Sequence, residues 1–280
     1  MPRRGRTVAK GVAMEKNEGR LVFGGMARWD GLDLFGPNYT SVAYRRKGNI
    51  HIKLEPSVLR RPANPTVQRI SRWPVIRSFF LWARVFVQVF GSIWSLLFFA
   101  ATLAVLWLFV SLMQLGSGVG AVGGVFAFFA AFPILPVLLI FFAAMKFTPI
   151  GRYHGAEHKA VAAYETYGEV TLQNARNSSR IHPRCGTNIL LYIILAALLD
   201  PLIAWWGYAI LQFILISEAW FVFGTTRPSI AVGNFLQRYF TTTEPRRAEL
   251  EVAVESLNRL LQAEEGREID EAAVLVKARY

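Results

Sequence analysis

Long uncharged apolar stretches in the middle of the chain predict membrane-spanning helices. Residues 85–115 contain no charged side chain, and residues 121–145 form a second such stretch after a glycine-rich turn at residues 116–120. About 20 apolar residues span a bilayer as a helix, so each stretch is long enough for one span. Pro133 and Pro136 predict a kink in the second helix, because proline removes a backbone donor and clashes with the preceding turn.

A third apolar stretch covers residues 188–223 and is interrupted by Asp200, Pro201 and Glu218. As one helix it would be about 54 Å long, against a hydrocarbon core of about 30 Å. We therefore expect two helices that turn near Asp200 and Pro201, of which the first is short. A single tilted or broken helix is the alternative.

The distribution of basic residues favours four spans. Lys and Arg number 17 in residues 1–84, 6 in residues 146–188 and 8 in residues 224–280, which accounts for all 31. Four spans place these three groups on one face of the bilayer, and the positive-inside rule makes that face cytoplasmic. Three spans would leave the last group outside. The pattern predicts a multi-pass protein whose N- and C-termini are cytoplasmic.

The remaining segments predict small polar elements. Residues 39–44 and 49–54 alternate between apolar and polar positions around a turn at Lys47 and Gly48, which is typical of a β-hairpin. Residues 244–265 predict an amphipathic helix with Leu250, Val254, Leu257 and Leu261 on one stripe. The expected fold class is a mainly α membrane protein with about four transmembrane helices, a small N-terminal β-containing region and a C-terminal amphipathic helix.

This organisation divides the chain into six parts. They are a basic disordered tail (1–19), a small β-rich cytoplasmic region (20–66), a first transmembrane helix pair (67–145), a cytoplasmic segment with the candidate chemistry (146–188), a second transmembrane helix pair (189–223), and a cytoplasmic C-terminal helix and tail (224–280).

Amino-acid composition and net charge indicate what kind of partner the chain binds. The chain is 53% hydrophobic and 14% aromatic, above ordinary soluble usage, and its net charge of +12 suits an anionic surface. Because no nucleic-acid module is recognisable, we expect a lipid bilayer with anionic headgroups as the partner and do not expect nucleic acid. No apolar segment follows the first basic residues, so a cleavable signal is not expected. The single cysteine, Cys185, excludes an internal disulfide and leaves a buried thiol or a metal ligand.

The sequence H-x-x-E-H at His154, Glu157 and His158 predicts a metal site. Residues i and i+4 share one face of a helix, so both imidazoles can reach one ion. Glu157, one position away, is placed to accept a proton from an activated water, as in inverted zincin motifs. The simpler interpretation of the motif is a pair of surface histidines.

A third ligand must come from elsewhere in the chain. His182 and Cys185 are the first candidates, since imidazole and thiolate suit zinc. Glu218 is another, because a carboxylate near the end of an apolar helix needs a metal, a hydrogen-bond partner or a water-filled cleft. Alternatively Cys185 is a small buried side chain, and Glu218 pairs with Arg184 or a backbone donor. The expected cofactor is a divalent transition metal, namely zinc.

Four runs of sequence resemble a known family. They are GGMARWDG (24–31), RYHGAEHKAVAAYE (152–165), NARNSSRIHPRCGTN (174–188) and LQRYFTTTEP (236–245). They resemble the YqhQ-like family of bacterial membrane proteins, described as predicted metal-dependent enzymes of unknown function. The resemblance implies a place in the bacterial cytoplasmic membrane and points to His154, Glu157, His158, His182 and Cys185 as site residues.

Three classes of function follow from these features. The first is a metal-dependent hydrolase at the cytoplasmic membrane interface, with Glu157 as general base and Arg152 or Arg184 stabilising a developing anion. Its substrate is open, a peptide bond near the membrane or a lipid-linked ester. The second is a membrane adaptor with a structural metal, and the third a transporter built as a homo-oligomer. The glycines of residues 20–55 suggest that this region covers the metal site.

Overall fold

The computed structural model describes residues 21, 23–57, 64–90, 132, 134–199, 208–266 and 275–276, with the isolated positions 97, 108, 111, 112, 124 and 128. The predicted basic tail at 1–19 lies outside the described residues. So do most of residues 91–131 in the first predicted helix pair, and the predicted turn at Asp200 and Pro201.

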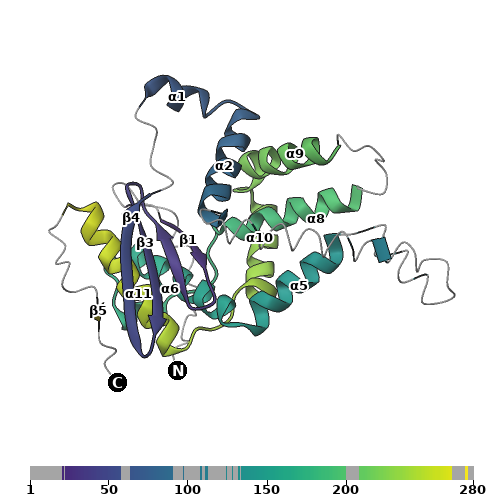
Figure 1. The fold of residues 1–280 in the computed structure, drawn as a ribbon. Helices are drawn as coiled ribbons and strands as arrows, with labels where there is room; N and C mark the ends of the chain where they lie inside the picture. The colour runs from purple at the N-terminus through teal and green to yellow at the C-terminus, as the bar shows by residue number, and fades with distance from the viewer. Residues whose placement is uncertain are drawn as a thin grey trace, which may run out of the picture.

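An antiparallel sheet forms one side of the molecule (Figure 1). Its order is β1 (Gly24–Ala27), β2 (Gly31–Phe35), β3 (Tyr39–Arg46), β4 (Asn49–Pro56) and β5 (Leu275–Val276). The β3–β4 pair is the hairpin that the alternation of residues 39–54 indicates, and Lys47 and Gly48 in its turn both have positive φ. Strand β1 is therefore the edge strand at the N-terminal side of the sheet.

Two long helices pack against this sheet. Helix α6 (Pro149–Tyr167) and helix α11 (Arg247–Glu264) lie side by side along it (Figure 1). The core between them contains Leu32 and Leu34 of β2 together with Leu257 and Leu260 of α11, all of which are fully buried. Of the stripe predicted for residues 244–265, Leu250 and Leu257 are buried in this core, and Val254 and Leu261 pack against it partly buried. Leu260 is not part of the predicted stripe.

The remaining helices are shorter. They are α1 (Pro65–Ile70), α2 (Ile76–Phe90), α5 (Ile134–Phe147), α7 (Leu172–Asn177), α8 (Leu190–Leu199), α9 (Tyr208–Phe223) and α10 (Arg227–Leu236). Of these, α7 packs against α6 and α11. A short 3₁₀ segment, η1 (Gly186–Ile189), precedes α8, and a π-helical turn, η3 (Gln237–Thr241), follows α10. Between α5 and α6 the chain bends by 70°. Thr148 at this bend caps α6 by accepting a hydrogen bond from the Ile150 amide.

The described helices overturn the predicted fold class. Within the residues that the structure describes, no one helix combines the length and the apolar character needed to cross a membrane. The bent helix pair Leu135–Phe147 and Pro149–Tyr167 reaches the length and apolar composition of a membrane span only when its two halves are counted together. In the described part of residues 188–223, helices α8 and α9 contain 10 and 16 residues. They are therefore about 15 and 24 Å long, shorter than a core of about 30 Å.

The prediction of a mainly α membrane protein with about four transmembrane helices is therefore wrong, as is the predicted multi-pass location in a bacterial cytoplasmic membrane. Both predictions start from the length of apolar stretches, and the predicted location adds the distribution of basic residues and the family resemblance. Apolar length does not determine where a helix begins and ends. The described fold instead combines an antiparallel sheet with packed helices.

Candidate metal centre

Helix α6 carries three of the candidate site residues. Its N-terminus is fixed by the cap at Thr148 and by Pro149 in the first turn, and it ends at Gly168, which has the left-handed conformation of a helix C-cap. His154, Glu157 and His158 are all buried on this helix. Their spacing therefore places them on one face, as the H-x-x-E-H pattern predicts.

His154, His158 and Cys185 form a compact donor cluster. Each offers one ligand atom, and these atoms all lie within 4.8 Å of one another. The Sγ atom of Cys185 is 3.4 Å from Nε2 of His154. Two ligands of a tetrahedral zinc ion, one nitrogen and one sulfur, are about 3.6 Å apart. The cluster could therefore bind a metal ion.

Backbone carbonyls orient both imidazoles for this role. Nδ1 of His154 lies 2.7 Å from the carbonyl oxygen of Thr241, and Nδ1 of His158 lies 2.7 Å from that of Arg180. A carbonyl oxygen only accepts hydrogen bonds, so Nδ1 carries the proton in each ring. Nε2 is then the unprotonated nitrogen in each neutral imidazole. Burial and the nearby His154 lower the pKa of His158, which favours its neutral, ligand-competent form.

The thiol of Cys185 also has hydrogen-bond donors. The backbone amide of Thr187 donates to Sγ at 3.4 Å, and the Thr187 hydroxyl lies 3.0 Å from the same sulfur. Such donors stabilise a thiolate, which is the form of cysteine that binds metals. Cys185 precedes η1, so the start of this 3₁₀ segment holds the sulfur over α6.

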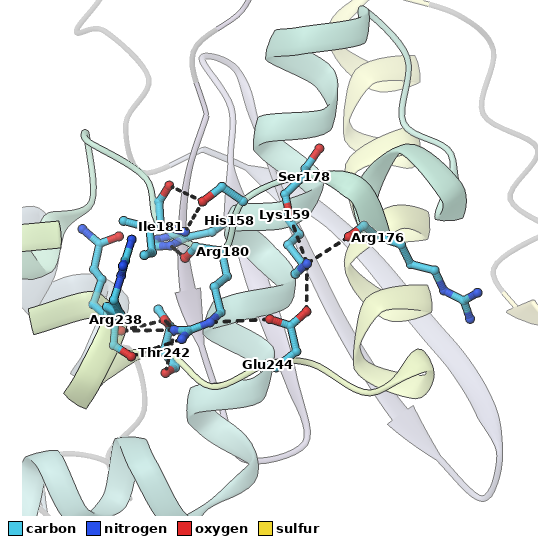
Figure 2. A network of polar contacts seen from close by, with 11 residues as sticks. His158, Lys159, Arg176, Ser178, Arg180, Ile181, Arg238, Thr242 and Glu244 are labelled. Atoms are coloured by element: carbon cyan, nitrogen blue, oxygen red, sulfur yellow. Dashed lines mark hydrogen bonds and ion pairs between the residues drawn. The ribbon is translucent and has the colours of Figure 1, made fainter. Parts of the chain in front are cut away.

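The Arg180 side chain connects its own segment to the segment that contains Thr241. These two segments provide the carbonyl oxygens that accept hydrogen bonds from His158 and His154. Its guanidinium donates to the carbonyl oxygens of Thr242 and Arg238 at 3.1 Å each, and to the Thr242 hydroxyl, and it lies 3.5 Å from the Glu244 carboxylate (Figure 2). The Arg180 carbonyl oxygen accepts a hydrogen bond from His158, and Thr241 lies between Arg238 and Thr242. One side chain therefore connects the supports of both histidines.

Lys159 completes this network from α6. Its buried ammonium group donates to the carbonyl oxygens of Arg176 and Ser178 at 3.0 Å each and pairs with Glu244 at 2.8 Å (Figure 2). A buried lysine is stable only when its charge is compensated, and here a carboxylate and two carbonyls do so. Lys159 thereby fixes the loop that leads to Arg180.

The close approach of residues 241–245 to α6 depends on Gly155. A Cβ atom at this position would collide with the carbonyl oxygen of Thr243. The π-helical turn η3 ends at Thr241 and directs its carbonyl towards His154. Such turns inside helical segments are frequent at functional sites.

Glu157 is buried beside the donor cluster. Within the described part of the chain, its Oε2 atom is buried and has no hydrogen-bond partner. Burial raises the pKa of this carboxyl, while His154 and His182 act in the opposite direction. An orphaned buried carboxylate oxygen is costly unless a water, an ion or a substrate group satisfies it. This observation fits a bound metal with an associated water.

His182 lies next to the cluster but is engaged elsewhere. Its ring centroid is 5.8 Å from that of His158. Its Nε2 atom lies 3.0 Å from the Glu165 carboxylate, and its Nδ1 atom accepts a hydrogen bond from the Arg184 amide at 3.4 Å. Both ring nitrogens are therefore occupied. Burial raises the pKa of Glu165, but the hydrogen bond from His182 and the charge of Arg184 outweigh it, and the net shift is downward.

Glu218, the fifth predicted ligand, does not belong to the cluster of His154, His158 and Cys185. Its carboxylate accepts hydrogen bonds from Arg77 at 2.6 and 2.9 Å, from Ser78 at 2.6 Å and from the Val75 amide at 3.0 Å. The hydrogen bond from Arg77 is the main reason that its pKa is lowered. It thus joins α2 to α9, beside the contact between Trp82 and Ser217.

A cavity of about 310 Å³ opens onto the donor cluster. Glu157, His182 and Arg184 line it with the three donors, and apolar side chains form another wall. Residues 23–27, which include β1, line it as well. Arg152 does not line this cavity and instead pairs with Glu249 at 2.7 Å.

Several residues that build the centre carry no signal of their own in the sequence. Arg180 and Thr241 act through backbone carbonyls, and Gln237 holds the backbone of His182 with hydrogen bonds of 2.8 and 3.0 Å. Their runs, 174–188 and 236–245, do belong to the segments that resemble a known family. That resemblance was the one available indication that these residues serve the site.

Comparison with known proteins places the chain in a family. Residues 78–226, just over half of the chain, match the model of a family described as "Protein of unknown function (DUF1385)". The chain therefore belongs to this family. It is also similar to the uncharacterized protein YqhQ of Bacillus subtilis (strain 168), with 32% identity over 148 residues.

The alignment with YqhQ covers 45% of this chain and 45% of that relative, so the chain spans less than half of the relative's length in the match. Together the two matches support the YqhQ-like family that the sequence motifs indicate. No solved structure matches the chain. All three residues of the donor cluster fall within the family match.

Proposed function

We propose that this protein is a metal-dependent hydrolase in which His154, His158 and Cys185 hold a zinc ion. The observation that carries the proposal is the orientation of the donors. Two buried imidazoles donate Nδ1–H hydrogen bonds to backbone carbonyls, and their ligand atoms cluster with the Cys185 thiol. Beside them lies a buried Glu157 carboxylate oxygen that has no partner among the described residues. Nitrogen and thiolate donors favour zinc over calcium or magnesium.

The number of donors favours a catalytic site over a structural one. Structural zinc sites are normally closed by four protein ligands, whereas catalytic sites use three and keep one position open. Among the described residues, three side chains form the cluster, and both nitrogens of the adjacent His182 are occupied. A purely structural metal in an adaptor protein is less well supported for this reason.

When bound, zinc would lower the pKa of a water molecule and polarise a substrate carbonyl. Glu157 in its ionised form takes a proton from the attacking water. The water oxygen bonds to the carbonyl carbon, the bond to the leaving group breaks, and the proton on Glu157 passes to that group. Arg184, which lines the cavity, stabilises negative charge on the substrate oxygen.

The first test is metal content. The full chain, purified without chelators, is expected to hold about one zinc per molecule, and the His154→Ala/His158→Ala double variant is expected to lose it. In the cobalt-substituted protein, acetohydroxamate should change the visible absorption spectrum, because it occupies an open coordination position. Equal metal content in wild type and double variant would overturn the metal site. An unchanged cobalt spectrum would overturn the catalytic interpretation.

The second test concerns Glu157. Wild type and Glu157→Gln are compared on a panel of quenched-fluorescence peptide libraries and ester substrates. The variant should retain zinc and lose hydrolysis by about 10²- to 10⁴-fold, the typical contribution of a general base. Hydrolysis that is equal in both proteins would contradict the role of Glu157.

A further inference from the structure

Strand β1 is an edge strand that faces the donor cavity. Among the described residues, β1 pairs with β2 and has no partner on its other side. An unpaired strand edge presents free amide and carbonyl groups that can pair with another extended chain. The cavity that opens onto His154, His158 and Cys185 is lined by residues 23–27, and so by the whole of β1.

The cavity is lined by residues from both faces of β1. Successive residues of a strand point to opposite faces. A Cβ atom on Gly25 would lie 2.5 Å from the Glu157 carboxyl carbon, whereas one on Gly24 would lie near Phe35 at 3.9 Å. Both glycines nevertheless line the same cavity. The edge of a strand, where the main chain is accessible, lets consecutive residues line one cavity.

The hydrogen-bond register shows which main-chain groups of β1 are not used by β2. The Arg28 amide donates to the Gly31 carbonyl oxygen at 2.8 Å, which makes these two residues a hydrogen-bonded pair. Bonded and non-bonded pairs alternate along an antiparallel ladder. The pairs Ala27↔Leu32 and Gly25↔Leu34 are therefore non-bonded. The amides and carbonyls of Gly25 and Ala27 point away from β2, towards the free edge.

The position of Gly25 connects this edge to the reacting groups. It lies directly against Glu157, so a chain paired with Gly25 would pass next to the proposed general base. Neighbouring strands lie about 4.8 Å apart, so such a chain would run directly beside β1. Phe141, Met145 and Ile150 on the cavity wall offer an apolar surface to one of its side chains.

We propose that the substrate is an extended polypeptide that binds as an additional strand on the free edge of β1, through the main chain of Gly25 and Ala27. This inference rests on the proposed hydrolase function and specifies its substrate class. An apolar side chain of the substrate packs against the part of the cavity wall that α5 forms. In the reaction, the peptide C–N bond breaks, water adds its oxygen to the carbonyl carbon, and the new amine takes the proton held by Glu157. A lipid-linked ester has no row of amides and would not use this edge.

The test uses the zinc-loaded, full-length Glu157→Gln protein, which should bind peptides without cleaving them. A random peptide display library is selected on it, after peptides that bind the immobilisation matrix alone have been removed. The selected peptides are synthesised with single N-methyl groups at each backbone amide. Methylation at alternate positions should weaken binding by about tenfold or more, because only every second amide pairs with a strand.

A matched pair of protein variants tests the strand directly. Ala27→Pro removes the outward amide and is tolerated on an edge strand, whereas Ala27→Ser keeps it. Ala27→Pro should weaken peptide binding by about tenfold with unchanged zinc content and acetohydroxamate binding. If Ala27→Pro fails to fold, the series of N-methylated peptides still tests whether the peptide binds as a strand.

Two outcomes would overturn the inference. One is that no peptide is enriched, and the other is that selected peptides bind without any alternating N-methyl pattern. In either case, intact zinc and acetohydroxamate binding would leave the proposed hydrolase standing, with a non-peptide ester as its substrate. Loss of metal binding itself would instead contradict the proposed function.

Discussion

The carboxyl group of Glu157 lies directly against the backbone of Gly25, so closely that a methyl group on Gly25 would come within 2.5 Å of its carboxyl carbon. These residues are far apart in the chain, one on the edge strand β1 and the other in the middle of α6. Their contact shows that the glycine-rich N-terminal segment is part of the site. It also means that the Glu157 carboxylate can be displaced without changing any residue of α6.

Gly25→Ala is expected to impair hydrolysis and to leave metal binding intact. The added methyl group must push the Glu157 side chain aside, and a shift of about 1 Å in a catalytic group can cost about 10²-fold in rate. Gly24→Ala is the matched control, since its Cβ atom would meet only Phe35, at 3.9 Å. Steady-state hydrolysis and zinc titration are measured on both variants. Equal rates for the two variants would contradict the proposed dependence on Glu157.

Arg180→Ala is expected to weaken zinc binding by about 10- to 100-fold, the usual effect of losing support behind metal ligands. The arginine joins the segment that supports His158 to residues 238–244, which support His154. Arg176→Ala is the control. Its backbone accepts from Lys159, but among the described residues its side chain makes no hydrogen bond or ion pair and points away from the network (Figure 2). Competition with a chromogenic chelator gives both affinities, and an equal loss in the two would contradict the role of Arg180.

Cys185→Ser is expected to abolish the thiolate-to-cobalt charge-transfer absorption of the cobalt-substituted protein. This band reports a metal–sulfur bond, and Cys185 is the single cysteine in the chain. Thr187→Val, which removes the hydroxyl 3.0 Å from Sγ, should keep the band while lowering the affinity. A band that survives Cys185→Ser would show that the metal binds elsewhere. Absence of the band in the wild-type protein would remove Cys185 from the ligand set.

Glu218→Gln is expected to destabilise the fold without affecting zinc. Removing the charge from a carboxylate with four hydrogen bonds should cost about 1–3 kcal/mol near pH 7. The folded state lowers the pKa of Glu218, mainly through Arg77, so its contribution to stability is present above the unfolded pKa. It is lost as the pH falls through the folded pKa.

Urea unfolding of wild type and Glu218→Gln at a series of pH values measures this difference. The two free energies of unfolding should differ by a constant amount from about pH 5 to 7 and converge below about pH 4. Glu55→Gln, an exposed partner of Lys53, serves as the control and should change stability little. Loss of zinc on Glu218→Gln would contradict the assignment of Glu218 to the contact between α2 and α9.

The parts of the centre that the sequence predicts are those with local spacing. His154 and His158 are four residues apart on one helix, so helical periodicity alone puts them on one face. The hairpin of β3 and β4 is equally local. In contrast, Glu218 was assigned to the metal from its depth in an apolar stretch. Its actual partner, Arg77, could not be identified from the sequence because the two are distant in the chain.

The error in fold class has a related cause. Apolar length predicts how much of a chain avoids water, but caps and bends decide where helices stop. In the described part of the third apolar stretch, helices α8 and α9 contain only 10 and 16 residues. After α5 the chain turns by 70°, where Thr148 caps α6. The contact between Gly25 and Glu157 likewise depends on how the sheet packs on α6. Glycine content alone suggested that the N-terminal region covers the site, without indicating which residue makes the contact.

The hydrogen bond from His154 to Thr241 also sets a limit on how small a metal-binding fragment of this protein can be. A peptide made of α6 and the Cys185 loop would contain all three donors, yet one imidazole would rotate freely for lack of its carbonyl. The family match ends at residue 226, before Thr241. A truncated protein or a minimal synthetic mimic would therefore have to retain the π-helical turn η3 to reproduce the affinity of the full chain.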